Sequence, residues 1–391
     1  MQNVEDIYAL SPMQQGMLFH SVQAPLDAVY VEQKVCTLRG PLEGNALRRA
    51  WQHVVDDVPA LRTAFLWEGL DDPLQVVRRH AALPWIEEDL RALAAGERER
   101  RLARFLKEDR ARGIPPSSAP LMRVALFRIE DDVHELVWTH HHLVLDGWSL
   151  PLIYRDVFAS YAALRAGLPP PRVASRPYRE YIRWLLQQDR AEAARFWRRE
   201  LAGFDTPTPL PIRGAGARGG GDATYGDTEI VTTPEETQAL RAFARGHALT
   251  VNTLVQAAWG LLLGFETGTD DVVFGATVSG RPPDLPGVES MIGLFINTLP
   301  VRLRLADRRA LLEWLRDLQA RQVEMRQYEY SALTEIRQWT AVPNDRPLFD
   351  SILVYENYPT DPARELGDLD VRIESLKSVE RGSYPLIVKA A

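Results

Sequence analysis

The chain has a single cysteine among its 391 residues, and this scarcity excludes several kinds of site. Cys36 has no partner for a disulfide within the chain, and one thiol does not build a cysteine-based zinc centre. We interpret Cys36 as a small buried hydrophobic residue rather than as a reactive thiol. A reducing compartment is compatible with this composition.

Long apolar runs and basic stripes are also missing. No apolar segment reaches the roughly 18 residues that a membrane span requires, and the N-terminal MQNVEDIYAL lacks the basic and apolar regions of a signal peptide. The formal net charge is -7, with positive and negative residues mixed along the chain. We therefore expect a cytoplasmic protein that binds neither nucleic acid nor membrane.

What is present is the composition of an ordinary globular protein. Hydrophobic residues make up 46% and charged residues 25%, which excludes disorder, collagen-like repeats and a coiled coil as the main architecture. Patterns of period two and period 3.6 alternate along the chain, so we expect an α/β fold in layers. Ser11-Pro12-Met13-Gln14 predicts a capped helix start. Strands are expected near 28–38, 62–68, 121–129, 133–141, 271–278, 298–305 and 349–356, and further helices near 47–58, 89–112, 151–167, 181–197, 234–246, 250–266 and 308–327.

Two stretches interrupt this alternation. Residues 167–177 hold three consecutive prolines and read as an extended connector, which divides the chain into lobes at 1–170 and 178–391. Residues 204–224 contain the glycine-rich GAGARGGG, and we expect an exposed loop there.

The most distinctive segment is Thr139-His140-His141-His142-Leu143-Val144-Leu145-Asp146-Gly147, where an expected strand runs into a turn. Strand geometry places His140 and His142 on one face and His141 on the other, which disfavours a shared metal ion. A neutral imidazole can accept a proton near pH 7, although buried structural histidines remain an alternative. For Asp146, a salt bridge is preferred over a plain turn role.

The run HHLVLDG resembles the HHxxxDG signature of condensation domains of nonribosomal peptide synthetases. The order of further motifs matches the same family over nearly the whole chain: SPMQQGMLFH, ALRTAF, YREYIRW, FWRREL, IGLFINTLPVR and NDRPLFDSILVYENYP. The resemblance implies a V-shaped pseudo-dimer of two chloramphenicol acetyltransferase-like lobes around a central tunnel.

The resemblance also implies partners and a reaction. Upstream donor and downstream acceptor peptidyl carrier proteins would present their substrates on 4′-phosphopantetheine, and the acceptor amine would attack the donor thioester to form an amide. Adjacent synthetase domains are further expected partners. The domain itself is expected to bind no cofactor and no metal.

Residue roles follow from the resemblance. His142 is the expected catalytic residue, His141 is structural, and Asp146 maintains the architecture by pairing with Arg281 or, as the second choice, Arg62. We expect the backbone N–H of Gly147 to be an oxyanion donor because glycine permits close approach.

Four further positions are expected along the tunnel, each with a structural alternative. Trp148 and Ser149 are expected to pack against and cap the helix that follows. Asn297 and Thr298 either contact substrate or form an ordinary turn before a strand.

Other activities of the same superfamily are alternatives: an epimerization domain, a non-catalytic recruiting domain, or an acyltransferase that uses coenzyme A. The opening SPMQQGMLFH resembles the subclass that takes a D-configured donor and an L-configured acceptor. Because relatives usually continue beyond SYPLIVKAA, we expect either that the second lobe is truncated at its end or that the chain is an excised piece of a much larger synthetase.

Overall fold

The chain forms two compact units, and each is discontinuous in sequence. The computed structural model describes residues 3–23, 29–210, 226–306, 309–343, 346–356, 370–380 and 382–391. The first unit contains residues 1–188, 279–296 and 358–383, and the second contains residues 189–278, 297–357 and 384–391. The chain therefore leaves the first unit and returns to it twice.

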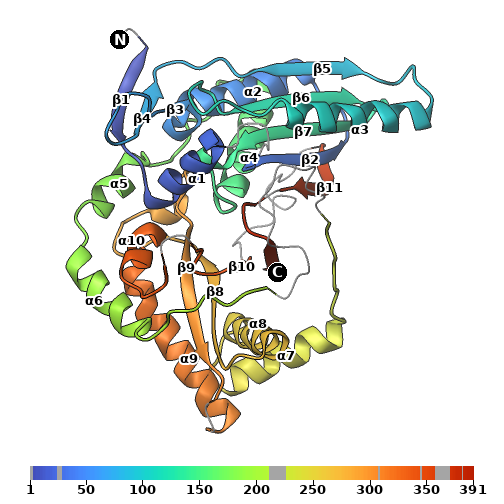
Figure 1. Cartoon of the computed structure of the whole chain (residues 1–391). Helices are drawn as coiled ribbons and strands as arrows, with labels where there is room; N and C mark the ends of the chain where they lie inside the picture. The colour runs from blue at the N-terminus through green and yellow to red at the C-terminus, as the bar shows by residue number, and fades with distance from the viewer. Residues whose placement is uncertain are drawn as a thin grey trace. The chain divides into compact units, whose positions relative to one another are not determined.

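A five-stranded mixed sheet is the framework of the first unit (Figure 1). The strand order is β11-β2-β7-β6-β5, and all neighbours are antiparallel except β5, which runs parallel to β6. Its strands are β2 (Val31–Arg39), β5 (Trp85–Asp89), β6 (Met122–Arg128), β7 (Val133–His141) and β11 (Arg372–Val379).

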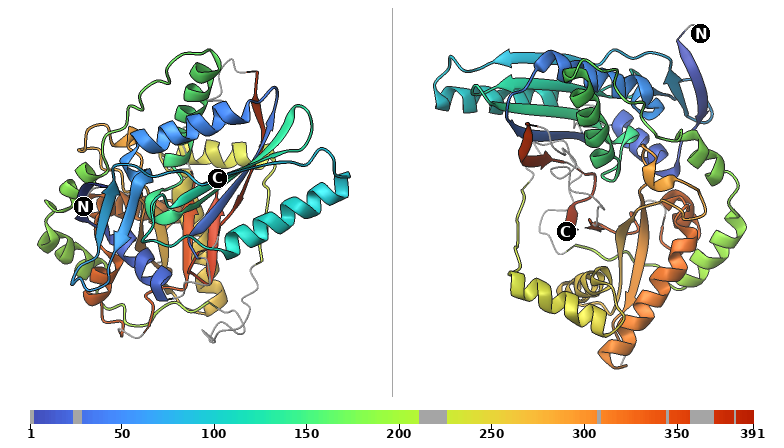
Figure 2. Two further views of the ribbon diagram at one scale, coloured as in Figure 1. Left: turned by 90° about the horizontal axis from the view of Figure 1, so that it is seen from above. Right: turned by 180° about the vertical axis from the view of Figure 1, so that it is seen from behind.

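Helices cover both faces of this sheet (Figure 2). On one face, α2 (Gly44–Asp57) and α4 (Ser149–Arg165) pack through the fully buried aromatic side chains of Trp51 and Tyr154, which surround Trp138 of β7. On the other face, α3 (Ala95–Ala111) packs Phe105 against Phe127. Burial on both faces explains why β7 consists almost entirely of buried residues.

A second, antiparallel sheet of the first unit joins segments that are distant in sequence, in the order β1-β4-β3. Its strands are β1 (Val4–Ala9), β3 (Thr63–Leu66) and β4 (Leu74–Arg78), with the 3₁₀ turn η1 (Pro59–Arg62) before β3. Between β1 and β2 lies α1 (Pro12–Gln23), which starts at the predicted capping box: Gln14 Oε1 accepts the Ser11 N–H at 2.9 Å.

The proline-rich stretch 167–177 is extended, as predicted, but it lies along the first unit. The backbone N–H of Val173 donates to Asp57, and the carbonyl of Pro171 contacts His53. The chain passes to the second unit at Gln188, between α5 (Arg179–Leu185) and α6 (Arg190–Glu200). We expected one helix there. Asp189 interrupts it because its carboxylate caps α6 by accepting two backbone N–H groups.

The second unit contains a four-stranded sheet in the order β12-β10-β8-β9. Its core includes Trp197, Phe274 and Phe349, all buried. The strands are β8 (Asp271–Val278), β9 (Asn297–Arg304), β10 (Ser351–Tyr355) and β12 (Leu386–Ala390), and the remaining helices are α7 (Pro234–Gly246), α8 (Val251–Thr267), α9 (Leu311–Met325) and α10 (Leu333–Gln338). Two further 3₁₀ turns are η3 (Val288–Ser290) in the first unit and η4 (Arg326–Tyr328) in the second.

Most predicted elements are present, and β7 and β8 have the predicted bounds. The predictions missed β1, β4, β5, β11 and β12. The predicted loop at 204–224 lies mostly outside the described residues, which stop at 210 and resume at 226. Among the described residues, no single helix is long and apolar enough to cross a membrane, although the bent pair α7 and α8 passes that test by length and composition.

Candidate active site

The histidine signature lies where β7 ends and the chain turns into α4. The strand ends at His141, the 3₁₀ turn η2 (His142–Val144) follows, and α4 begins at Ser149. The backbone N–H of His142 donates to the carbonyl of Tyr30 at 2.8 Å. Tyr30 has a φ of +69°, a left-handed conformation that is uncommon for a bulky residue. The hydrogen bond therefore joins the turn after β7 to an unusual backbone conformation just before β2.

His142 is held in one tautomer by its own turn. Its Nδ1 lies 2.5 Å from the carbonyl oxygen of Leu145. Because a carbonyl oxygen only accepts, Nδ1 carries the proton, and Nε2 of the neutral ring has a free lone pair. The side chain is 18% exposed, so the ring is partly accessible. This arrangement suits a proton acceptor.

The two preceding histidines have a different environment. Burial is the main cause that lowers the pKa of His141 to about 3 and the pKa of His140 to about 4, so both rings are neutral near pH 7. His141 Nδ1 accepts the Leu143 N–H at 3.1 Å, and its Nε2 lies 3.3 Å from the Ser21 hydroxyl. These contacts agree with a structural role. Within the described residues, no group of His, Cys, Asp and Glu has the arrangement of a metal site.

Sequence reasoning did not identify the carboxylate beside His142. Glu32 of β2 lies directly opposite His140, and its Oε1 is 3.5 Å from His142 Nε2. Its Oε2 is 3.3 Å from Lys34 Nζ. Burial alone would raise the pKa of Glu32, but Lys34 and then His142 lower it below its ordinary value. A partial signal was present, because Glu and Lys at alternate positions of a mostly buried strand place two charges on one face.

Asp146 pairs with Arg281, the first of the two arginines considered. Arg281 Nη2 lies 3.2 Å from Asp146 Oδ1, and both side chains are buried. Nη1 of Arg281 donates to the carbonyls of Val288 and Met291, at 2.5 Å and 2.9 Å. The ring of Phe295 lies 4.0 Å from the guanidinium carbon. Asp146 therefore connects the signature to the returning segment 279–296.

Arg62 does not contact Asp146. It pairs with Glu5 of β1 at 2.7 Å and donates to the carbonyls of Val55 and Arg79. The prediction of Arg62 as the alternative partner is wrong, because its guanidinium fastens the small sheet to the end of α2.

Ser149 and Trp148 support the same turn. The Ser149 hydroxyl is buried, donates to Asp146 Oδ1 at 2.7 Å and accepts the Gly293 N–H at 3.1 Å. The expected cap is provided by Asp146, whose carboxylate accepts the Ser149 N–H, while Trp148 occupies the N-cap position. Trp148 donates its indole N–H to the carbonyl of Glu289. Gly147 lies between them, half-buried.

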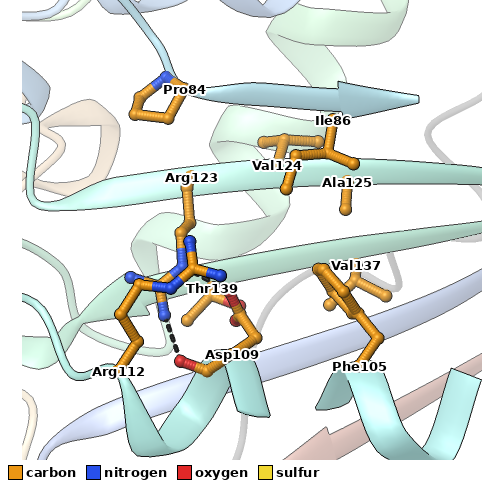
Figure 3. A pocket seen from close by; sticks show the side chains of 10 residues that line it. All are labelled: Pro84, Ile86, Phe105, Asp109, Arg112, Arg123, Val124, Ala125, Val137 and Thr139. Carbon is orange, nitrogen blue, oxygen red and sulfur yellow. Dashed lines mark hydrogen bonds and ion pairs between the residues drawn. The ribbon is translucent and has the colours of Figure 1, made fainter. Parts of the chain in front are cut away.

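The opposite face of β7 is anchored by a buried carboxylate (Figure 3). Asp109 of α3 accepts hydrogen bonds from Thr139, Gln33 and Arg123 around a cavity of about 30 Å³. A space of this size holds about one water molecule, so the cavity is no substrate site. The network instead fixes the strand that carries the histidines.

Residues 4–390 match the model of the family described as the condensation domain. The chain belongs to the condensation domain family.

Curated relatives of this condensation domain are much longer proteins. One of the subunits of linear gramicidin synthase from Brevibacillus parabrevis is 44% identical over 399 residues, which cover 100% of this chain and 8% of the relative. Chondramide synthase of Chondromyces crocatus is 40% identical over 427 residues, which cover 99% of this chain and 11% of the relative. The condensation domain thus spans about a tenth or less of the length of these relatives.

Solved structures show the fold of the condensation domain. The first condensation domain of the calcium-dependent antibiotic synthetase, in complex with a substrate analogue, matches with a TM-score of 0.77 at 20% identity, covering 97% of this chain and 86% of that chain. The starter condensation domain of rhizomide synthetase matches with a TM-score of 0.78, also at 20% identity, covering 98% and 86%. The predicted mixed α/β fold related to chloramphenicol acetyltransferase is confirmed.

The opening motif of the condensation domain contacts the signature directly. The Gln14 side chain donates to the carbonyl of Leu143 at 3.0 Å, within HHLVLDG. Two motifs that the sequence separates by more than a hundred residues are thus part of one site in the first unit.

Asn297 and Thr298 belong to the second unit. The Asn297 side-chain amide donates to the carbonyls of Glu329 and Ser331, at 2.8 Å and 2.7 Å, and its oxygen accepts the Thr298 N–H. These bonds use both donors of the amide, so Asn297 joins β9 to the segment after α9. Asn297 and Thr298 are the first two residues of β9, so they belong to the strand and not to a turn before it.

Proposed function

We propose that this chain catalyses peptide-bond formation between a donor acyl or peptidyl thioester and the amine of an acceptor aminoacyl thioester. The single observation that carries the proposal is His142 in an intact HHxxxDG signature, with Nδ1 directed at the Leu145 carbonyl and Nε2 beside the Glu32 carboxylate. The names of the curated relatives, which are synthases of linear gramicidin and chondramide, support the same reaction class.

In the proposed reaction the amine nitrogen attacks the thioester carbonyl carbon. The C–N bond forms, the carbonyl electrons move to oxygen, and His142 Nε2 accepts one amine proton. Collapse of the tetrahedral intermediate breaks the C–S bond, and the same proton passes to the departing thiolate. Typical pKa values of about 7.7–8.0 for an α-amine and 8.5 for a thiol mean that a strong base is unnecessary near neutral pH.

The oxyanion of the intermediate needs a donor, and we propose the backbone N–H of Gly147. The turn is held on both sides, by Asp146 and by Trp148, so this N–H has a fixed direction. A Gly147→Val variant is expected to lose transfer by about 100-fold while remaining folded. Full activity in that variant would exclude the assignment.

The proposed substrates arrive on the 4′-phosphopantetheine arms of upstream donor and downstream acceptor carrier proteins, within a larger synthetase. The domain would need no cofactor of its own. The relatives, which are about ten times longer than this chain or more, support neighbouring synthetase domains.

The test loads two carrier proteins, one with an aminoacyl or peptidyl thioester and one with an amino acid. Intact-protein mass spectrometry then follows the acyl group for the native chain and for His142→Ala. We expect transfer by the native chain and a loss of at least about 100-fold in the variant. Absence of transfer by a folded native chain that binds carriers would contradict the proposal and favour a recruiting domain.

Two further arms distinguish the remaining alternatives. Replacing the acylated carrier by acyl-CoA tests a coenzyme A-dependent acyltransferase. Chiral analysis of the donor residue tests epimerization, which would invert the α-carbon without making an amide.

We also propose a D-configured donor and an L-configured acceptor. The opening SPMQQGMLFH supports this, and its Gln14 contacts the signature. Carriers loaded with D-terminated and L-terminated donor peptides should differ in rate in favour of the D form. Equal rates, or a preference for the L form, would reject the subclass.

A further inference from the structure

We infer that Glu32 is a positioning residue for His142. The buried carboxylate of Glu32 orients the imidazole and balances the positive charge that the ring gains when Nε2 takes up a proton. The inference rests on the proposed function, because that proton comes from the acceptor amine. Glu32 is proposed to act through His142 and not on the substrate directly, since its side chain is only 9% exposed and faces the ring.

The first argument is geometric. Glu32 and His140 are direct partners in the β2–β7 pairing, so His142 lies beside Glu32 just beyond the end of the paired strand. The distance of 3.5 Å from Glu32 Oε1 to His142 Nε2 is within ion-pair range but long for a hydrogen bond. The carboxylate therefore acts on Nε2 through its charge and leaves the lone pair available to an amine.

The second argument is the charge around Glu32. Lys34 Nζ contacts Glu32 at 3.3 Å, is in direct contact with Glu380 after β11, and donates to Ser378 at 2.6 Å. Burial would lower the pKa of Lys34, but Glu32 and Glu380 raise it above its ordinary value. Because two carboxylates share this ammonium, Lys34 balances the charge of Glu32 only in part.

The histidines of β7 do not supply the rest of the balance. His140 and His141 are both neutral near pH 7, because burial lowers their pKa values to about 4 and about 3. Although His140 Nε2 lies 3.7 Å from Glu32 Oε2, the neutral ring brings no positive charge to the carboxylate. An imidazolium at His142, on the other carboxylate oxygen, would bring one.

The rigidity of these groups supports a positioning role. Lys34 is the direct partner of Ser378 in the β11–β2 pairing, so three adjacent strands fix the charged groups. No loop rearrangement is required for the carboxylate to face the ring. Charges fixed in advance stabilise a developing charge better than mobile ones do.

The test replaces Glu32 by Gln, which keeps shape and hydrogen-bonding capacity and removes the charge. NMR titration of histidine-labelled protein measures the pH at which the His142 ring is half protonated, called the midpoint below. The His142 resonance is assigned by its absence in His142→Gln. We expect the midpoint in Glu32→Gln to move to lower pH by about one unit or more. The acidic limb of the pH profile of carrier-to-carrier transfer should move in the same direction, and the plateau rate should fall by about three- to tenfold.

Glu135→Gln is the matched control, because it removes a carboxylate from β7, of the same sheet, that bonds Thr37 and does not contact the histidines. Its His142 midpoint should equal that of the native chain. An unchanged midpoint in folded Glu32→Gln would overturn the inference. If Glu32→Gln fails to fold, Glu380→Gln decides, since loss of this more exposed charge should move the midpoint in the same direction by a smaller amount.

Failure of the proposed function has a different signature. If the native chain transfers no acyl group between carriers, the reaction assignment is wrong, whereas the NMR titration still shows whether Glu32 governs the ring.

Discussion

The carboxylate of Asp146 accepts hydrogen bonds from several groups around the signature. It accepts the Ser149 N–H and hydroxyl, the Phe295 N–H and the Arg281 guanidinium, while Asp146 is 1% exposed. These bonds satisfy a buried charge whose removal would leave Arg281 without its carboxylate partner. In the proposed reaction, Asp146 would act through the position of the turn that carries Gly147.

Replacement of Asp146 by Ala should destabilise the protein by about 3–5 kcal/mol, because an uncompensated buried guanidinium remains. Urea unfolding followed by circular dichroism measures this change. Asp131→Ala is the control, since Asp131 is 87% exposed and its ion pairs with Arg91 and Arg128 lie at the surface. The control should change stability by less than about 1 kcal/mol. Similar losses in both variants would contradict the assigned role.

At this scale the sequence was informative where a residue belongs to a recognisable motif. The signature and SGRPP pointed to Asp146 and Arg281, and their side chains form the expected ion pair. Glu32 was missed because the charge pattern of β2 does not show that Glu32 lies opposite His140, which depends on the register of β2 against β7. Arg62 was misjudged for the same reason, since its partner Glu5 belongs to a strand that was not predicted.

The returning segment 279–296 is the element that completes the turn around the signature. Its second residue is Gly280, whose φ is +60° and where an added Cβ would lie 1.8 Å from the carbonyl oxygen of Phe295. Only glycine fits both conditions. The next residue is Arg281, so the backbone at Gly280 directs the guanidinium toward Asp146.

Gly280→Ala should therefore cost several kcal/mol and weaken transfer between carriers. Gly167→Ala is matched to it, since Gly167 has a φ of +71° in the same unit but open space around its Cβ position. The control should lose only about 1–2 kcal/mol from the left-handed conformation. Thermal unfolding of the two variants measures the difference. Equal losses would show that the close approach to Phe295 is unimportant.

The periodicity of a segment predicted elements well when the segment was long. Two buried strands, β7 and β8, and most helices were located from alternation and helical spacing alone. Strand β5 escaped because it has only two apolar residues, Trp85 and Ile86, and no buried position. Strands β11 and β12 escaped because exposed and half-buried residues dominate them, so the apolar signal is weak.

At the scale of the whole molecule, the division into units differs from the single boundary that the proline-rich stretch suggested. Residues 167–177 are anchored to the first unit, and segments 279–296 and 370–380 return to it. Local composition indicates where a chain is extended, but not which unit it packs against. Contacts between distant segments decide that question.

Stability should fall as the pH is lowered from about 6.5 toward 4. His140 and His141 have folded-state pKa values of about 4 and about 3, whereas an unfolded histidine titrates near 6.5. Between these values the unfolded chain binds more protons, so the stability present above pH 6.5 is lost on acidification. Each histidine contributes a slope of about 1.4 kcal/mol per pH unit.

Urea unfolding at several pH values between 4 and 7 measures this slope. A folded His141→Gln variant should reduce the slope by about 1.4 kcal/mol per pH unit, because one of the buried neutral rings is removed. His53→Gln is a suitable control, since His53 is only partly buried beside Asp57. An unaltered slope in His141→Gln would contradict the assignment.

The pairing of β11 with β2 also affects how the protein is made. Until residues 372–379 leave the ribosome, β2 of a nascent chain has no neighbour on that side and exposes an edge with unpaired backbone groups. Glu32 and Lys34 lie on this edge strand, and inward-pointing charges discourage an open edge from pairing with another chain. The charges proposed to serve His142 in the finished domain would thus also protect the unfinished one from aggregation.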